Sequence, residues 1–229
     1  MKILLISSSP HKEKSMTFLL AKEAVKGLAQ EGVESESIHL DDFRILFCKH
    51  CEECHKHILN CPLQDDVKNI LKKILDADGI ILASPNYINQ ITASMKALFD
   101  RSAHFIHCKR LSGKYVIGAV SSGSGRNKDV LTYLKHYAHT CGAQYCGGIS
   151  SARQLGADKI KEAFKLGKKL SADIKQKKIY PKQIAIIEKS KQHFREIIRF
   201  RKNDWQEEYA YWVTKGWIDK DKQDISPDK

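Results

Sequence analysis

Four cysteines lie within fourteen residues, and their spacing is the feature of this sequence that points most directly to chemistry. They form a C-x2-C-x2-C-x6-C pattern, in which three thiolates at intervals of three can face one metal centre while a fourth closes the cage. A structural zinc site more often takes its ligands as two separated pairs, so the pattern favours an iron–sulfur cluster over zinc or an unmetallated loop. The predicted ligands are Cys48, Cys51, Cys54 and Cys61.

Five histidines lie near these cysteines or later in the chain. His50, His55 and His57 flank the predicted ligands and are expected to be surface residues, with hydrogen bonding to a cluster as the alternative. His104 and His107 are expected either to pair with helix carbonyls or to lie near a bound cofactor. No histidine is predicted to be catalytic.

Cysteine usage and the N-terminus indicate a cytoplasmic protein. Seven cysteines with this spacing do not resemble a disulfide framework, so a reducing compartment is expected. Met1 to Leu5 leads into a short apolar stretch without a cleavage site, and no apolar run is long enough to cross a bilayer. The other cysteines, Cys108, Cys141 and Cys146, are then predicted to be small buried thiols.

The loop at residues 7–17 follows a predicted buried strand and carries several hydroxyls. Ser9, Ser15 and Thr17, together with free N–H groups at a helix start, can hold a phosphate, to which His11 or Lys12 adds charge. The alternative is an ordinary serine-rich turn with Ser15 as the N-cap. Because neither G-x-G-x-x-G nor G-x-x-x-x-G-K-[ST] is present, a phosphate site here indicates a mononucleotide.

Two further loops have the character of ligand sites. In residues 84–89, Pro85 stiffens the backbone, Tyr87 offers a flat face, and exposed peptide groups can meet the edge of an isoalloxazine ring. In residues 121–126, two glycines allow the backbone to approach a ligand closely. Each loop alone is more often a plain connection. Three of them at one sheet edge predict a single binding site.

The elements that must position these loops alternate between buried strands and amphipathic helices. This alternation predicts a three-layer, doubly wound α/β domain with a five-stranded parallel sheet in the flavodoxin-like order 2-1-3-4-5, whose ligands bind beyond the carboxyl ends of the strands. Strands are predicted at residues 3–6, 35–40, 79–83, 115–120 and 145–149, and helices at residues 16–28, 65–75, 93–105, 128–140 and 158–175.

The predicted domain covers residues 1–178, with the cysteine loop at 43–64, and a helical extension covers 179–229. Residues 158–202 hold fifteen Lys and Arg against five Asp and Glu, and thus +10 of the total charge of +12. Such a run is more often a solvated helix face than a nucleic-acid groove; an acidic protein or a phosphorylated dinucleotide is a weaker alternative. Aromatic residues in the extension need cover from the domain or a second subunit, which favours a homodimer or homotetramer.

The sequence resembles the iron–sulfur flavoproteins, which belong to the larger group of NAD(P)H-dependent FMN reductases with a flavodoxin-like fold. The resemblance rests on the Ser-Ser-Ser-Pro-His-Lys run at residues 7–12, on the cysteine string followed by Asp65-Asp66, and on the Ser-Pro-Asn-Tyr run at residues 84–87 that leads to Met95–Arg101. It extends over roughly residues 1–175. The cysteine spacing and the Lys96–Arg101 segment are its most specific parts.

The resemblance implies FMN bound by the three loops and a [4Fe-4S] cluster held by the four cysteines, with a reduced donor such as NAD(P)H or a ferredoxin-like protein. Two alternatives stay open: an NAD(P)H-dependent FMN or quinone reductase without a cluster, and a non-enzymatic zinc or nucleic-acid-binding module. The residues that the resemblance places around FMN are Ser9, His11, Ser15, Thr17, Pro85, Asn86, Tyr87, Ile88, Ser121, Gly123 and Arg126.

Overall fold

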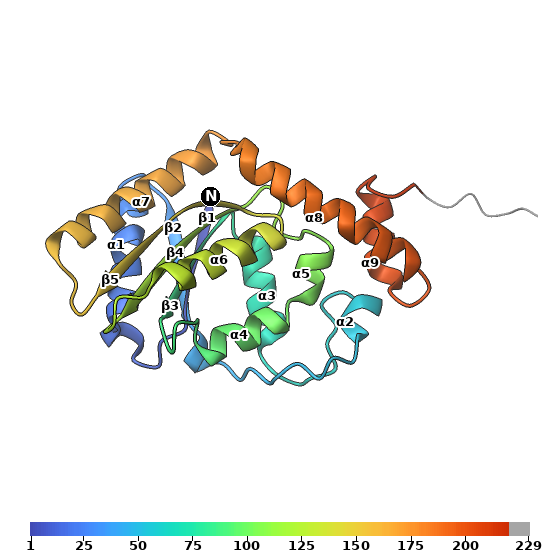
Figure 1. The fold of residues 1–229 in the computed structure, drawn as a ribbon, viewed down its shortest axis with the longest axis horizontal. Coiled ribbons are helices and arrows are strands. Elements are labelled where there is room, and N and C mark those ends of the chain that lie inside the picture. Colours follow the sequence, from blue (N-terminus) through green and yellow to red (C-terminus); the bar gives the residue numbers. More distant parts are fainter. Residues whose placement is uncertain (220–229) are drawn as a thin grey trace, which may run out of the picture.

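A computed structural model describes residues 1–219, and its centre is a parallel sheet with the strand order β2-β1-β3-β4-β5 (Figure 1). The strands are β1 (Lys2–Ser7), β2 (Glu34–His39), β3 (Gly79–Pro85), β4 (Tyr115–Ser122) and β5 (Gln144–Ala152). Every neighbouring pair is parallel, as the alternation of strands and helices requires. The flavodoxin-like strand order predicted from the sequence is confirmed.

Helices cover both faces of the sheet, which gives three layers (Figure 1). They are α1 (Met16–Ala29), α2 (Glu53–Lys56), α3 (Val67–Asp76), α4 (Ala93–Asp100), α5 (Ala103–His107), α6 (Lys128–Thr140), α7 (Ala157–Lys175), α8 (Pro181–Phe200) and α9 (Gln206–Thr214). Helices α1 and α7 pack on one face, and α3, α4 and α6 pack on the other. A Cβ on Gly167 would lie 1.9 Å from the carbonyl oxygen of Ala24, so glycine lets α1 and α7 approach closely.

Two local differences from the sequence prediction concern the region around the cysteines. The single helix predicted at residues 93–105 is wrong: α4 ends at Asp100, and α5 begins at Ala103. Arg101 occupies the break, where its buried guanidinium turns toward Asp65 and the carbonyl of Leu46. The short helix α2 inside the cysteine loop was not predicted, because four residues are too few to show a helical period.

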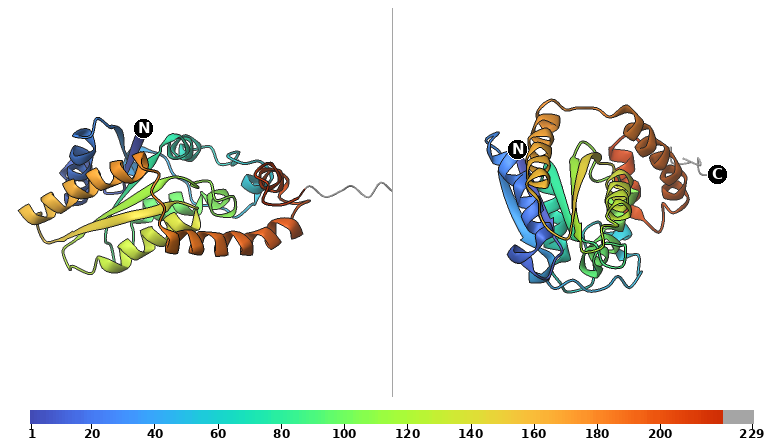
Figure 2. Two further views of the ribbon diagram at one scale, coloured as in Figure 1. Left: turned by 90° about the horizontal axis from the view of Figure 1, so that it is seen from above. Right: turned by 60° about the vertical axis from the view of Figure 1, so that its left-hand side comes forward.

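Two helices form the described part of the C-terminal extension. Helix α8 runs along the side of the domain, and α9 then lies beside α2 in the cysteine loop (Figures 1 and 2). Trp205 and Trp212 are buried in a cluster that includes Cys108 and Ile198, so the parent domain itself covers them. These two side chains therefore do not require a second subunit, and the predicted oligomer stays a prediction. No helix within residues 1–219 has both the length and the apolar character needed to cross a membrane.

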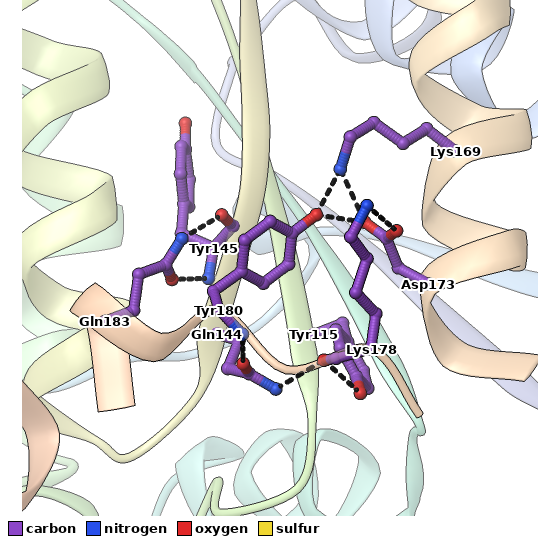
Figure 3. Close-up of polar contacts among 8 residues, drawn as sticks. All are labelled: Tyr115, Gln144, Tyr145, Lys169, Asp173, Lys178, Tyr180 and Gln183. Carbon is purple, nitrogen blue, oxygen red and sulfur yellow. Dashed lines mark hydrogen bonds and ion pairs between the residues drawn. The ribbon is translucent and has the colours of Figure 1, made fainter. Parts of the chain in front are cut away.

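Side-chain amides anchor the start of the extension to the edge strand β5 (Figure 3). The Gln183 amide accepts a hydrogen bond from the backbone N–H of Tyr145 at 2.7 Å and donates one to its carbonyl at 3.0 Å. It thus occupies the place of a neighbouring strand and covers part of an exposed sheet edge. Nearby, the Tyr180 hydroxyl donates to Asp173 at 2.5 Å, and Lys169 pairs with the same carboxylate. The predicted boundary after residue 178 falls in this turn and stays a prediction.

Candidate functional site

The carboxyl ends of β1, β3 and β4 lie at one edge of the sheet, which brings the three predicted binding loops together. Ser7 pairs in register with Ala83, and Pro85 pairs with Ser121, so the loops leave the sheet side by side. This arrangement follows from parallel pairing, which places the carboxyl ends of all strands on the same side. The predicted FMN residues therefore share one region of the molecule.

The first loop is fixed by hydroxyl groups. Ser15 is the N-cap of α1, where its hydroxyl accepts a hydrogen bond from the Phe18 amide at 3.4 Å, as the alternative interpretation of this loop stated. Ser9 is buried and accepts a hydrogen bond from the amide of the exposed His11. The hydroxyl of Thr17 lies 2.6 Å from that of Ser121, so the first loop is bonded directly to the third.

The second loop combines a firmly held base with a strained, exposed tip. The Asn86 amide N–H donates to the Ser121 carbonyl at 2.8 Å, and its side-chain amide donates to the Arg126 carbonyl at 2.7 Å. The side-chain oxygen of Asn86 is buried and lacks a partner within residues 1–219. Ile88 is 97% exposed with a φ of 51°, a costly conformation for a β-branched residue. Tyr87 beside it is half exposed.

The third loop is the most open of the three. Ser121 is buried, whereas Gly123 and Arg126 are exposed. Asn127 holds the end of the loop, because its side-chain amide donates to the Ser151 carbonyl of β5 at 2.9 Å. The sequence interpretation missed Asn127, although an asparagine just before a predicted helix is a recognisable N-cap signal. The Asn127 side-chain oxygen is not bonded to the helix and instead accepts a hydrogen bond from the Asn86 side-chain amide at 3.4 Å, so Asn127 links the second loop to β5.

The four predicted metal ligands line a single cavity of about 80 Å³. Cys48 and Cys51 are exposed, Cys54 and Cys61 are half-buried, and all four are free thiols. Residues His50 and Glu52 have φ values of 50° and 60°, and these left-handed turns curve the chain between successive cysteines. The residues that the spacing pattern singled out therefore do converge in space.

Burial opposes ionisation of the cysteine that lies deepest. Desolvation, the Glu208 carboxylate and the neighbouring thiols together raise the pKa of Cys54 to about 12. A thiol must lose its proton to bind a metal, so a positive centre has to supply the compensating charge here. Without such a centre, Cys54 stays a protonated thiol.

A buried ion pair closes the base of the cysteine loop. Arg101 donates to both carboxylate oxygens of Asp65, at 2.6 and 3.1 Å, and to the Leu46 carbonyl at 2.8 Å. Burial alone would raise the pKa of Asp65, but hydrogen bonds from Arg101 and from the Leu46 amide hold it below its ordinary value. Both residues belong to segments that carried the family resemblance, but their pairing could not be read from the spacing.

The C-terminal extension supplies a carboxylate to the other side of the loop. Glu208 is fully buried, and its two oxygens lie 2.7 Å from Nδ1 of His55 and 3.0 Å from Nδ1 of His107. Burial alone would raise the pKa of Glu208, but the two imidazoles hold it below its ordinary value. The ring of Trp205 lies against both imidazoles, with centroid distances of 4.6 and 4.9 Å.

Two further hydrogen bonds, one to a backbone amide and one between side chains, complete this junction. Glu207 accepts a hydrogen bond from the Ile58 amide at 2.6 Å, and Glu52 accepts one from the indole N–H of Trp205 at 3.2 Å. Glu52 also pairs with Arg201 at the end of α8. The cysteine loop is thus held by residues about 150 positions later in the chain. The extension was expected to need cover, but this role was missed.

The histidines occupy positions that differ from those expected. His55 is buried against Glu208 and is not a surface residue, whereas His50 and His57 are exposed as expected. His107 pairs with Glu208 and not with a helix carbonyl. His104 is buried, and neither of its ring nitrogens has a partner in the described chain. Burial and the charge of Arg110 lower the pKa of His104 to about 3, which leaves the ring neutral.

Comparison with known proteins then decides the family. Residues 1–157 match the family model described as NADPH-dependent FMN reductase. The chain belongs to this family. An iron–sulfur flavoprotein of Methanocaldococcus jannaschii is 37% identical over 197 aligned residues, which is 74% of this chain and all of the relative. One from Archaeoglobus fulgidus is 28% identical and covers 95% of this chain and all of its own. The chain is thus related to the iron–sulfur flavoproteins, as its motifs indicated.

Solved structures of other flavin proteins share the fold of this FMN reductase family member. The crystal structure of an NADH:FMN oxidoreductase superimposes with a TM-score of 0.56 at 22% identity, over 80% of this chain and 92% of the other. The family match ends at residue 157, where α7 begins, so the extension that carries Glu208 lies beyond it. The cysteine loop and the three carboxyl-edge loops all lie within the matched residues.

Proposed function

We propose that this chain moves electrons between a reduced donor and an acceptor, using FMN at the carboxyl edge of the sheet and an iron–sulfur cluster on the four cysteines. The observation that carries the proposal is the convergence of all four predicted sulfur ligands on one cavity, in a chain of the FMN reductase family. Reduced NAD(P)H or a ferredoxin-like protein is the proposed donor. The non-enzymatic zinc or nucleic-acid-binding alternative is disfavoured by membership of an oxidoreductase family.

The three loops at the carboxyl edge fit FMN. Ser15 and Thr17 stand at the N-terminus of α1, where free N–H groups and hydroxyls favour a phosphate, and Ser9 lies in the loop before it. The unpartnered oxygen of Asn86 offers a polar contact, and the exposed Tyr87 offers an aromatic face. The remaining proposed contacts come from His11, Pro85, Ile88, Ser121, Gly123 and Arg126. Bound FMN would supply the ability to accept two electrons and release them singly.

The cysteine cavity fits a cluster with four thiolate ligands, and a [4Fe-4S] cluster is the proposed type. Four thiols are the ligand number of such a cluster, and Arg101 on the cavity wall adds positive charge beside a group that carries negative charge. Asp65 bonds to Arg101, and Glu208 bonds to His55. These side-chain contacts hold the cysteine loop in place, although no strand of the sheet runs through its residues 43–64. The cluster would pass single electrons, and the chain would control its exposure to water.

A reductase without a cluster remains the second candidate, because Cys48 and Cys51 are exposed and need no metal to satisfy them. A homodimer or homotetramer is also proposed, and in such an assembly the cysteine loop of one chain could approach the flavin of another. Light scattering tests the assembly. A monomer at micromolar concentration would remove the proposed electron path between subunits.

The decisive experiment is an absorption spectrum of protein purified without oxygen, combined with iron, sulfide and flavin analysis. We expect one FMN with about four irons and four sulfides per chain. Flavin without iron, even after anaerobic reconstitution with iron and sulfide, would support the reductase without a cluster. Colourless protein after both cofactors have been offered would overturn both proposals.

A further inference from the structure

Three histidines lie behind the cysteine loop, and one of them differs from the others. His55 and His107 each place Nδ1 against an oxygen of Glu208. His104 is only 1% exposed, and both of its ring nitrogens lack a hydrogen-bond partner within the described residues. A buried polar group without a partner destabilises a fold, and its presence needs an explanation.

The surroundings of His104 suggest what that explanation is. His104 lines a cavity of about 140 Å³ together with Cys54, Cys61 and Arg101. Cys54, Cys61 and Arg101 also line the cavity of about 80 Å³ that includes all four cysteines. The two cavities therefore meet at these three side chains. His104 therefore lines a cavity with the half-buried Cys54 and Cys61 and does not line the one that also includes the exposed Cys48 and Cys51.

We propose that His104 donates a hydrogen bond to a sulfur atom of the cluster, at Cys54, Cys61 or an inorganic sulfide, and thereby raises the reduction potential of the cluster. This inference rests on the proposed function, because it requires the cluster to be present. When one electron enters the cluster, negative charge on the sulfurs grows, and an N–H group directed at them stabilises the reduced form. The proton stays on His104, and only the electron is transferred.

Of the side chains that line this cavity, His104 is the one whose polar atoms are buried without a partner within residues 1–219. Glu208 engages His55 and His107 through Nδ1, and its negative charge opposes reduction of a nearby cluster. Arg101 donates to Asp65 and to the Leu46 carbonyl and also contacts Cys61, so its contribution to the cysteines is the same in the wild type and in every His104 variant. A neutral imidazole carries one N–H, and in His104 that N–H is not used by another group of the described chain.

Two substitutions, a third that serves as a replacement, and one control separate this role from a structural one. His104→Leu removes the donor, His104→Gln keeps a neutral N–H, and His104→Met replaces the leucine variant if that variant does not fold. The control is His139→Leu, because His139 is also buried but is bonded to Gln183 at 2.9 Å. Each protein is studied with the cluster loaded, by redox titration followed by electron paramagnetic resonance, and without metal, by thermal unfolding.

We expect His104→Leu to lower the reduction potential of the loaded protein and to raise the unfolding temperature of the metal-free protein. At the midpoint potential of the wild type, the ratio of reduced to oxidised cluster in His104→Leu should be about tenfold lower, equivalent to a fall of about 59 mV for one electron. The metal-free variant should unfold at a higher temperature, because two unpartnered nitrogens have been removed. His104→Gln should retain most of the potential. His139→Leu should keep the wild-type potential and unfold at a lower temperature.

Each contrary result has its own meaning. A loaded His104→Leu or His104→Met protein with the wild-type potential would overturn the role of His104 while leaving the cluster intact. A fall in unfolding temperature as large as that of His139→Leu would also overturn it, since His104 would then have a structural partner. Wild-type protein that cannot be loaded with iron would refute the cluster itself, and this role with it.

Discussion

The carboxyl edge of the sheet and the cysteine loop are positioned by different kinds of structure. At the edge, each loop continues from a buried strand, and the register of β1, β3 and β4 sets where it begins. The cysteine loop contains only one helix of four residues and three left-handed residues, His50, Glu52 and Leu59. Its position depends on polar side chains from other segments of the chain.

The two regions differ in how strongly their structure depends on any single contact. Backbone hydrogen bonds between strands are numerous and mutually supporting, so a single side chain contributes little to their register. The cysteine loop relies on a few charged contacts, chiefly Asp65 with Arg101 and Glu208 with His55 and His107. We therefore expect substitutions at the loop to have larger and more local effects than substitutions at the edge.

Cys54→Ala should separate the two regions most completely. We expect the variant to lose essentially all iron, because three thiols cannot complete a four-cysteine cluster, while FMN binding remains. Iron, sulfide and flavin are measured per chain after anaerobic reconstitution. Cys146→Ala is the control, since Cys146 is a buried thiol of β5 outside the loop, and it should keep its iron. Full iron content in Cys54→Ala would contradict the ligand assignment.

Glu208→Ala should release the loop from the extension. It leaves two imidazoles without their carboxylate, so we expect the free energy of unfolding to fall by about 3 kcal/mol. Amide hydrogen exchange should quicken in residues 53–58 more than in β1. Glu196→Ala is the matched control, because Glu196 is an exposed glutamate of α8, and it should cost less than about 1 kcal/mol. Equal losses in both variants would show that Glu208 does not hold the loop.

Acid should weaken the cysteine loop through Asp65. Because folding lowers the pKa of Asp65, its contribution is present above the ordinary aspartate pKa and is lost as pH falls through the lowered value. Asp65→Asn should therefore cost about 2 kcal/mol near pH 7 and progressively less below about pH 4. Urea unfolding at pH 7 and pH 3.5 measures the difference, with exposed Asp129→Asn as the control. A cost independent of pH would show that folding does not lower the pKa of Asp65.

Thr17→Val should have the smallest effect and should be confined to the carboxyl edge. It keeps the shape of the side chain but removes the hydroxyl that bonds Ser121, at a cost of about 1 kcal/mol. We expect weaker FMN binding, measured by fluorescence titration, with unchanged iron content. Loss of iron in this variant would mean that the two regions are coupled and not independently built.

The sequence predicted most of the regular structure because continuous apolar runs and helical periods are local signals. The strands and the long helices lie within a few residues of their predicted positions. It failed at residues 101–102, where the helix breaks, because the pairing of Arg101 with Asp65 is invisible to local periodicity. The cysteine ligands were named by spacing alone, but their convergence on one cavity needed the fold.

The sequence by itself thus determined the strands, the long helices and the close spacing of the four cysteines, since each depends on residues that are neighbours in the chain. The metal chemistry of these cysteines stays a proposal. Only the tertiary structure decided that Glu208 reaches His55 across 153 positions, and that His104 stays buried without a partner beside the cysteines. The physical reason is that periodicity and spacing record which face of an element is buried. They do not record which distant charge or donor the fold brings against it.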